Sequence, residues 1–138
     1  MSKSLILKIV TPEFVVYQDQ VDFVSLMGVE GSFGVLPGRA PFVAQLQIAT
    51  AMIERNGQRI PVAIMGGLCK VKEGHITVLT EAAELGKDID VLRAQEKKRE
   101  LEHMLQKTDA DLTLQVDHEA RLKKALVRLR TAELVRGA

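Results

Sequence analysis

Residues 80–94 read TEAAELGKDIDVLRA, and the glycine near the middle of this stretch, Gly86, separates two kinds of sequence. All the prolines and all the aromatic residues lie before Gly86, whereas residues 87–136 contain neither glycine nor proline. Glycine and proline mark turns and interrupt helices. The sequence therefore predicts a head of short elements, residues 1–86, followed by a largely helical tail, residues 87–138.

The head has the pattern of a β-sandwich. Apolar segments rich in valine, isoleucine and phenylalanine are separated by turn-forming residues, among them Asn56–Gly57, a strong hairpin signal. Many short strands at this spacing indicate an antiparallel sandwich, and we expect two sheets packed face to face. The expected strands are Ser4–Val10, Phe14–Tyr17, Val21–Met27, Phe33–Leu36, Phe42–Leu46, Thr50–Glu54, Arg59–Met65, Leu68–Val71 and His75–Leu79. The expected core includes Ile9, Val24, Leu46, Ile64, Val71 and Val78.

The tail has the pattern of a two-helix antiparallel hairpin, because it consists mainly of strong helix formers. Asp88 can cap the first helix, and Asp90 favours its positive N-terminal end. A polar break near residues 107–111 offers a second N-cap. The candidates for that cap are Thr108, Asp109 and Asp111. The second helix is expected to carry an apolar stripe of Leu122, Ala125, Leu126 and Leu129.

The composition argues against several classes of protein. A single cysteine, Cys69, rules out an internal disulfide and fits a reducing compartment. The longest apolar runs are far too short to span a bilayer. The three histidines have no metal-ligand spacing, and neither a phosphate-binding P-loop nor a G-x-S-x-G motif occurs. We therefore predict neither a metal site nor an active site in this chain.

The end of the tail is basic, since residues 119–138 hold six basic residues against Glu119 and Glu133. Two interpretations are open: a solvated face whose long side chains cover an apolar stripe, or a contact surface for an acidic partner. No aromatic residue is interleaved with these charges, which argues against nucleic acid as the partner. The basic residues considered are Arg121, Lys123, Lys124, Arg128 and Arg130.

Three segments, taken together, resemble the epsilon subunit of bacterial F-type rotary ATP synthase. They are GSFGVLPGRAP at residues 31–41, MGGLCKV at residues 65–71 and IDVLRA at residues 89–94. Their order and spacing and the length of the chain all agree with that family. The resemblance implies a non-catalytic central-stalk subunit. Its head would bind the gamma subunit and the ring of c subunits at the cytoplasmic side of the bacterial inner membrane, touching the membrane only through the complex.

The resemblance also implies a mobile hairpin. A hairpin folded against the head permits rotation in both directions, whereas an extended hairpin reaches the catalytic beta and alpha subunits and blocks ATP hydrolysis. The five basic residues of the second helix would supply the inhibitory contact. Ser32 and Arg39 lie in the turn that would face the c ring, where the family commonly has an acidic residue and a histidine respectively.

In several members of that family the folded hairpin binds ATP as a regulatory ligand, and no cofactor is required. Asp90 and Arg93 match the acidic and basic positions of the family's I-D-x-x-R-A motif. Glu84 matches a further polar contact position, and Arg128 matches one of two arginines on the second helix. Lys124 stands at the other arginine position and lacks the planar fork that binds phosphate bidentately. From the residues alone, Asp90 and Arg93 also fit an i,i+3 ion pair.

Two other classes compete with a regulatory rotor subunit. A generic β-sandwich adaptor with a coiled-coil arm would need a heptad seam through both helices, and the polar block of residues 95–100 interrupts it. An enzyme with a site in the mouth of the sandwich would need convergent titratable groups, which the head does not offer.

Overall fold

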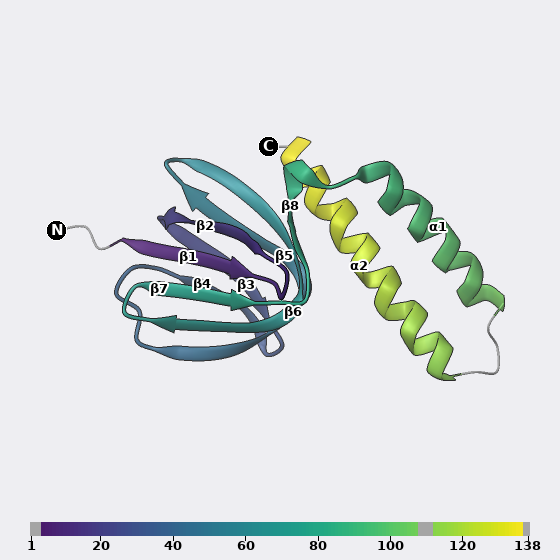
Figure 1. The fold of residues 1–138 in the computed structure, drawn as a ribbon, viewed down its shortest axis with the longest axis horizontal. Coiled ribbons are helices and arrows are strands. Elements are labelled where there is room, and N and C mark those ends of the chain that lie inside the picture. The colour runs from purple at the N-terminus through teal and green to yellow at the C-terminus, as the bar shows by residue number, and fades with distance from the viewer. Residues whose placement is uncertain (1–3, 108–111, 137–138) are drawn as a thin grey trace.

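The chain folds into a β-sandwich head and a two-helix hairpin that projects from one end of it (Figure 1). The computed structural model describes residues 4–107 and 112–136, so the expected caps Thr108, Asp109 and Asp111 lie outside the described residues. The fold class predicted from the sequence, an antiparallel β-sandwich followed by an antiparallel helical hairpin, is confirmed.

Eight strands form the head, and they join in one continuous sheet that folds back on itself rather than in two separate sheets. Neighbouring strands run in the order β2-β1-β7-β6-β5-β3-β4, with β8 paired to β6. All the pairings are antiparallel except that of β1 with β7. The strands are β1 (Leu5–Val10), β2 (Val15–Val21), β3 (Phe23–Gly28), β4 (Gly31–Val35), β5 (Phe42–Arg55), β6 (Gln58–Lys72), β7 (His75–Leu79) and β8 (Ala83–Leu85).

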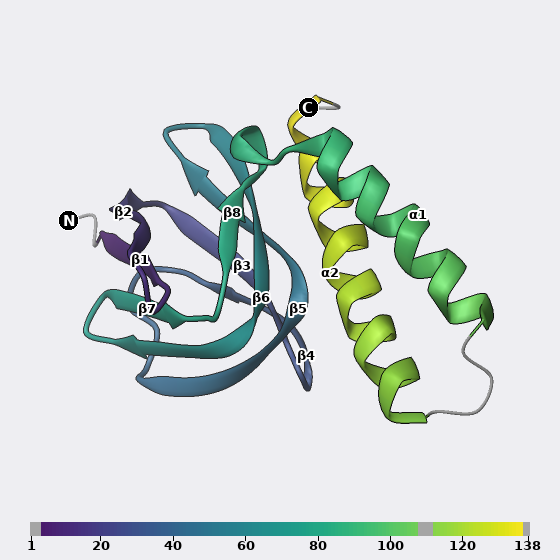
Figure 2. The same cartoon turned by 45° about the vertical axis from the view of Figure 1, so that its right-hand side comes forward.

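The two long strands explain why the prediction of two sheets was wrong. Four of the expected short strands are in fact the halves of β5 and β6, which pair along their whole length and curve around the head so that both layers share them (Figure 2). Gly66 and Gly67 both have positive φ values, of 79° and 115°. Such backbone is open to glycine and costly for other residues, so β6 can bend here: Gly66 itself is unpaired, and the register with β5 is the same on both sides of it.

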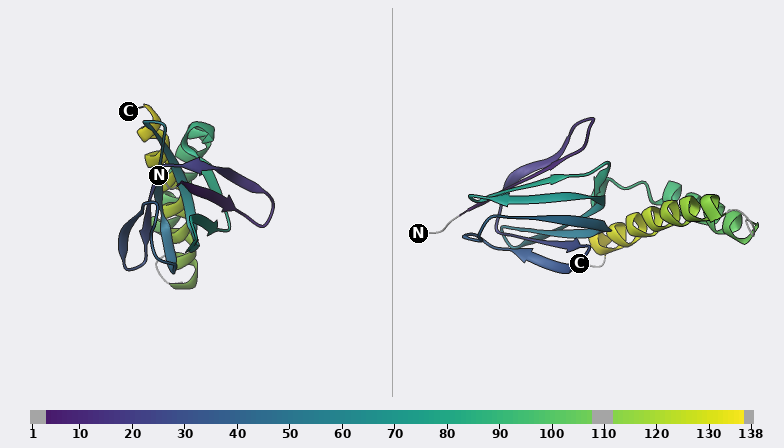
Figure 3. Two further views of the ribbon diagram at one scale, coloured as in Figure 1. Left: turned by 90° about the vertical axis from the view of Figure 1, so that its left-hand side faces the viewer. Right: turned by 90° about the horizontal axis from the view of Figure 1, so that it is seen from below.

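The sandwich core lies between the two layers, seen edge-on in the right-hand view of Figure 3. All six core residues expected from the sequence are buried, and Val78 is completely shielded from solvent. Burial of these alternating side chains is the main stabilising contribution to the head. The short strand β8 was not predicted, because its sequence, Ala83–Leu85, is too short to show alternation.

The tail consists of a 3-10 turn η1 (Gly86–Asp88) and two helices, α1 (Val91–Lys107) and α2 (Leu112–Arg136). Helix α2 lies between the head and α1 (Figures 1 and 2), and it contacts β5, β6 and η1. A second, smaller apolar cluster joins α2 to the head, and three of its four buried members come from residues 63–89. They are Ala63, Met65 and Ile89, together with Ala132 of α2.

A pair of threonines also links α2 to the head. Thr131 is completely buried, and its hydroxyl donates to the Val127 carbonyl of the preceding helical turn at 2.6 Å. The Thr50 hydroxyl of β5 lies 2.8 Å from the Thr131 hydroxyl oxygen. Since the Thr131 proton is already used, Thr50 is the donor across this interface. The contact between α2 and the head is therefore partly polar.

Candidate functional site

A cavity of about 400 Å³ opens where the end of the head meets both helices. Its volume falls in the range of small-molecule sites, roughly 300–1,000 Å³. Basic side chains outnumber acidic ones in its lining, so the cavity is suited to a polyanion. It is lined by Glu84 of β8, by Asp90 immediately before α1, by Arg93, Ala94 and Lys97 of α1, and by Arg121, Lys124, Ala125 and Arg128 of α2.

All five residues predicted for the nucleotide site line this one cavity, although they come from three separate segments. Two alanines make the arrangement possible. Ala94 and Ala125 are buried where α1 and α2 meet. Small side chains let two helices approach closely, and the longer charged side chains around them then surround a space instead of filling it.

Asp90 starts the first helix. Its Oδ1 accepts a hydrogen bond from the backbone N–H of Arg93 at 3.1 Å, which is the N-cap interaction of a helix that begins at Val91. The prediction that Asp88 caps this helix was wrong, because Asp88 belongs to the 3-10 turn before it. One oxygen of the Asp90 carboxylate is thus committed to the backbone, and it fixes the first turn of α1, with Arg93, at the edge of the cavity.

Arg128 and Glu84 form an ion pair inside the cavity. The Arg128 Nε lies 2.6 Å from the Glu84 Oε1, and the two side chains are 30% and 36% exposed. The pair joins α2 to β8. Because a guanidinium has five N–H donors, contact through Nε leaves the terminal nitrogens of Arg128 available to a ligand.

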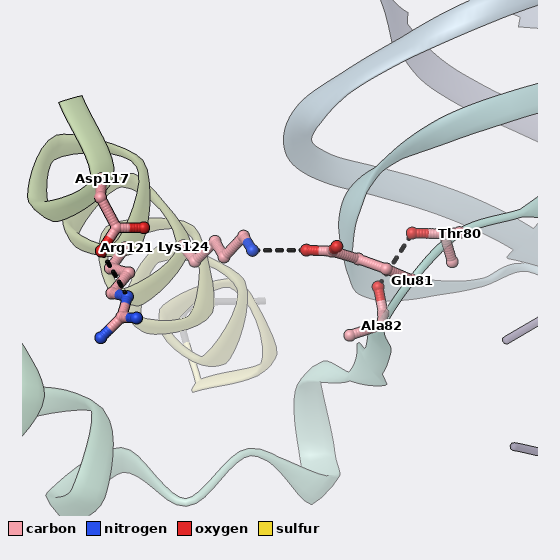
Figure 4. Close-up of polar contacts among 6 residues, drawn as sticks. All are labelled: Thr80, Glu81, Ala82, Asp117, Arg121 and Lys124. Atoms are coloured by element: carbon pink, nitrogen blue, oxygen red, sulfur yellow. Dashed lines mark hydrogen bonds and ion pairs between the residues drawn. The ribbon is translucent and has the colours of Figure 1, made fainter. Parts of the chain in front are cut away.

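Two further cations of the cavity are paired with carboxylates that do not line it (Figure 4). The Lys124 ammonium contacts the Glu81 carboxylate of the head, and Arg121 Nε lies 3.2 Å from Asp117 on the preceding turn of α2. Glu81 was not predicted from the sequence. It lies three residues before Glu84, and that spacing alone does not indicate which helical residue it meets.

Lys97 and Arg121 were not predicted as residues of the nucleotide site, although Arg121 was expected in the inhibitory surface. The sequence did carry a signal for both. Lys97 follows Arg93 by four residues and Arg121 precedes Lys124 by three, so each shares a helix face with a predicted site residue. The other two residues expected in the inhibitory surface, Lys123 and Arg130, are exposed and lie outside the cavity lining.

The predicted apolar stripe of α2 is only partly buried. Ala125 is 2% exposed and Leu122 and Leu129 are half-buried, whereas Leu126 is 44% exposed. In the docked hairpin this stripe therefore leaves the Leu126 side chain largely open to solvent. Helix α2 packs against both the head and α1, and Ala125 is the member of the stripe that this packing buries.

The turn expected to face the c ring surrounds a second cavity, of about 460 Å³, lined in part by Ser32 and Arg39. Arg39 is occupied locally: its guanidinium carbon lies 4.4 Å from the centroid of the Phe42 ring, and its Nη1 donates to the Gly34 carbonyl at 3.2 Å. These contacts fix the Arg39 loop against β4 and β5.

The other candidates for chemistry are inert or unsupported. Cys69 is fully buried, and burial raises the pKa of its thiol from 9.0 to about 11, which disfavours the reactive thiolate. Across residues 4–107 and 112–136 no group of histidine, cysteine, aspartate or glutamate side chains could hold a metal ion. Neither described helix combines the length and apolar character needed to cross a bilayer.

Comparison of the chain with known proteins identifies its relatives. Residues 4–86 match the family model for the β-sandwich domain of the ATP synthase delta/epsilon chain. The ATP synthase epsilon chain of Nitratidesulfovibrio vulgaris is 42% identical over 133 residues, covering 94% of this chain and 96% of its own. That of Bacillus licheniformis is 39% identical over 130 residues, covering 94% of this chain and 98% of its own.

Solved structures show the same fold. The Euglena gracilis mitochondrial ATP synthase, in a structure of its OSCP, F1 and c-ring parts, contains a chain that superimposes with a TM-score of 0.79 at 21% identity. This match covers 99% of the present chain and 83% of the other. The resemblance seen in the sequence is confirmed by the near-full-length relatives. On these grounds the chain belongs to the family of ATP synthase epsilon chains.

Proposed function

We propose that this chain is a non-catalytic, regulatory subunit of the central stalk, and that its helical hairpin responds to the level of ATP. The observation that carries the proposal is the cavity between head and hairpin, whose charged lining is contributed by three separate segments. The head, through the turn containing Ser32 and Arg39, would couple the gamma subunit to the c ring. The complex would hold the chain at the cytoplasmic side of the bacterial membrane.

A ligand in this cavity would favour the docked hairpin. Glu84 belongs to the head, Arg93 to α1 and Arg128 to α2, so a molecule that contacts all three binds only while α2 is docked. Binding to one conformation alone shifts the equilibrium toward it. The contact between α2 and the head is partly polar, and two of the four buried members of its apolar cluster are alanines, which bury little surface, so a ligand can shift the balance.

The lining suits a nucleoside triphosphate in particular. The five cations would meet the phosphates, with Arg128 able to bind in a forked geometry and Lys124 as a point charge. The Glu84 and Asp90 carboxylates accept hydrogen bonds and would meet donor groups of the base or the ribose.

When ATP is absent, the undocked hairpin would inhibit hydrolysis by contacting the catalytic beta and alpha subunits. Release of the hairpin frees Lys124 and Arg128 from the head, and they join the exposed Lys123 and Arg130 on one helix. The full inhibitory set is Arg121, Lys123, Lys124, Arg128 and Arg130.

Titration of the purified full-length chain with ATP, read by calorimetry, tests the nucleotide site. Arg128→Ala should weaken binding about 10- to 150-fold, because a hydrogen bond to a charged group contributes roughly 1.5–3 kcal/mol. Lys123→Ala is the matched control, since it removes the same charge from α2 outside the cavity. Equal ATP affinity in the wild type and in Arg128→Ala would exclude this cavity as the site.

Hydrolysis by the reconstituted soluble motor tests the inhibitory role. A chain ending at Lys87 should relieve inhibition, and replacing the five basic residues by alanine should relieve it most at low salt, where charges are least screened. If truncation has an effect and the five-fold variant has none, inhibition is steric and apolar. If truncation changes nothing, this chain couples stalk and ring without acting as an inhibitor.

A further inference from the structure

The cations that line the cavity between head and hairpin are unequally neutralised. All three on α2 have a carboxylate partner: Arg121 has Asp117, Lys124 has Glu81 and Arg128 has Glu84. The two on α1, Arg93 and Lys97, form no ion pair within the described part of the chain. An incoming anion therefore meets two free cations on α1 and three that already have partners on α2.

Glu81 differs from Glu84 in its position. Glu84 lines the cavity and can share Arg128 with a ligand, whereas Glu81 lies outside the lining and is 61% exposed on its side chain. Figure 4 shows Lys124 extended from α2 straight toward the Glu81 carboxylate on the head. The contact thus engages the Lys124 ammonium at a point on the head that the cavity does not include.

The backbone holds Glu81 in place. Glu81 lies in the connection between β7 and β8, where the Thr80 hydroxyl donates to the Ala82 carbonyl at 3.0 Å and so closes a tight turn around it (Figure 4). Thr80 is buried, and its N–H donates to the Val10 carbonyl of β1 at 3.1 Å. These hydrogen bonds fix the backbone from which the Glu81 side chain extends, so the carboxylate stays within reach of Lys124.

We infer that Glu81 is an affinity-setting residue, which competes with a bound polyphosphate for Lys124. This inference rests on the proposed nucleotide site. The charge of an ammonium group is concentrated on one nitrogen, whereas a guanidinium has three nitrogens and can bind one acceptor on each of two sides. A phosphate that contacts Lys124 must either displace Glu81 or lie beside its negative charge, and both lower the affinity. The carboxylate acts as an internal substitute for the ligand.

The variant Glu81→Gln, in the full-length chain, tests this inference. Glutamine keeps the size of the side chain and removes the charge, so Lys124 becomes available to the ligand. Binding of ATP and of tripolyphosphate, measured by calorimetry at low salt, should tighten about threefold to tenfold. The corresponding free energy lies between that of an exposed ion pair and that of a charge-assisted hydrogen bond. Glu73→Gln, on the β6–β7 turn at the end of the head away from the hairpin (Figure 1), should change affinity less than twofold.

A second background separates competition for Lys124 from a general effect of charge. When Glu81→Gln is added to a chain that carries Lys124→Met, the affinity for ATP and for tripolyphosphate should change less than about twofold. The ammonium group that Glu81→Gln would release is absent from that background. Equal tightening in both backgrounds would overturn the inference, since the effect would then be the field of one carboxylate. Unchanged or weaker binding in the single variant would also overturn it.

Docking of α2 must be followed in the same samples, by the amide resonances of Ala63 and Ala132 in the interface. If Glu81→Gln undocks the hairpin, Glu81 is a docking residue and the inference is wrong. ATP binding by the Arg128→Ala variant tests the proposed function separately. If Arg128→Ala weakens ATP binding while Glu81→Gln has no effect, only this inference fails; if Arg128→Ala has no effect, the nucleotide site itself fails.

Discussion

Replacing Gly86 with alanine should release the hairpin while the head stays folded. Gly86 is buried in the 3-10 turn, where the last turns of α2 pack directly on its backbone. A Cβ atom placed there would lie 2.6 Å from Val135 Cγ2, 2.9 Å from the Thr131 carbonyl oxygen and 3.1 Å from Pro61 Cγ. Val135 can rotate away, but the Thr131 carbonyl belongs to the helix backbone, so α2 itself must move.

The size of the effect follows from this geometry. Gly86 is not among the glycines with positive φ, so alanine brings no backbone strain and the cost is steric. One extra methyl group in a well-packed site costs roughly 1–3 kcal/mol. Two of the three close atoms belong to α2, so most of that cost acts on docking. The ratio of docked to undocked molecules should fall about 5- to 150-fold, and the apparent ATP affinity should fall in proportion to the docked fraction.

Pulsed electron-spin distance measurement between labels at Lys72 and Lys123 would report docking directly, since both positions are exposed and the buried Cys69 would not be labelled. Gly86→Ala should add a broad second distance population. Lys87→Ala, at the neighbouring exposed residue, should leave the single distance of the wild type. If Gly86→Ala gave that same single distance and unchanged ATP binding, close packing at Gly86 would not control docking.

Three further outcomes are expected. Thr131→Val should weaken docking by about 1–2 kcal/mol, because it leaves the Thr50 hydroxyl without its acceptor on α2; the same spin-label distance checks this, and an unchanged distribution would contradict it. A chain ending at Lys87 should unfold in one cooperative thermal transition, whereas a broad, gradual loss of signal would make the hairpin part of the core. Cys69 should resist a thiol reagent at neutral pH until the head unfolds. Its contribution to stability should be complete below pH 9.0 and be lost as the pH rises to about 11, because the unfolded thiol ionises first; rapid labelling of the native protein would show that the thiol is accessible.

The sequence predicted the kind of each element better than its extent. Alternation placed most strands and all six expected core residues correctly, because burial on one face leaves a period of two in the sequence. The same pattern divided β5 and β6 into halves, since Gly66 and Gly67 resemble a turn until the pairing across them is known. Local sequence does not distinguish a bend within a paired strand from the end of a strand.

The candidate site was predicted in part for a similar reason. The resemblance to the family gave the five expected lining residues, but not the partners that those residues have. Glu81 meets Lys124 only because the segment before β8 runs past α2, and that is a property of the packed head and hairpin. Contacts between segments distant in the sequence determine which charges are already neutralised.

The parallel pairing of β1 with β7 has a consequence for how the protein is made. Leu7 and Ile9 leave the ribosome early, yet β1 is completed on one side by Ile76 and Val78, which are among the last residues of the head. Until then β1 has β2 alone as a neighbour, and an apolar edge stays unpaired. Non-local pairings of this kind form slowly, and the head cannot close before β7 has been synthesised. The surface on which α2 docks, built from β5, β6 and η1, is synthesised entirely before α1 and α2, so the helix meets a head whose strands are already present.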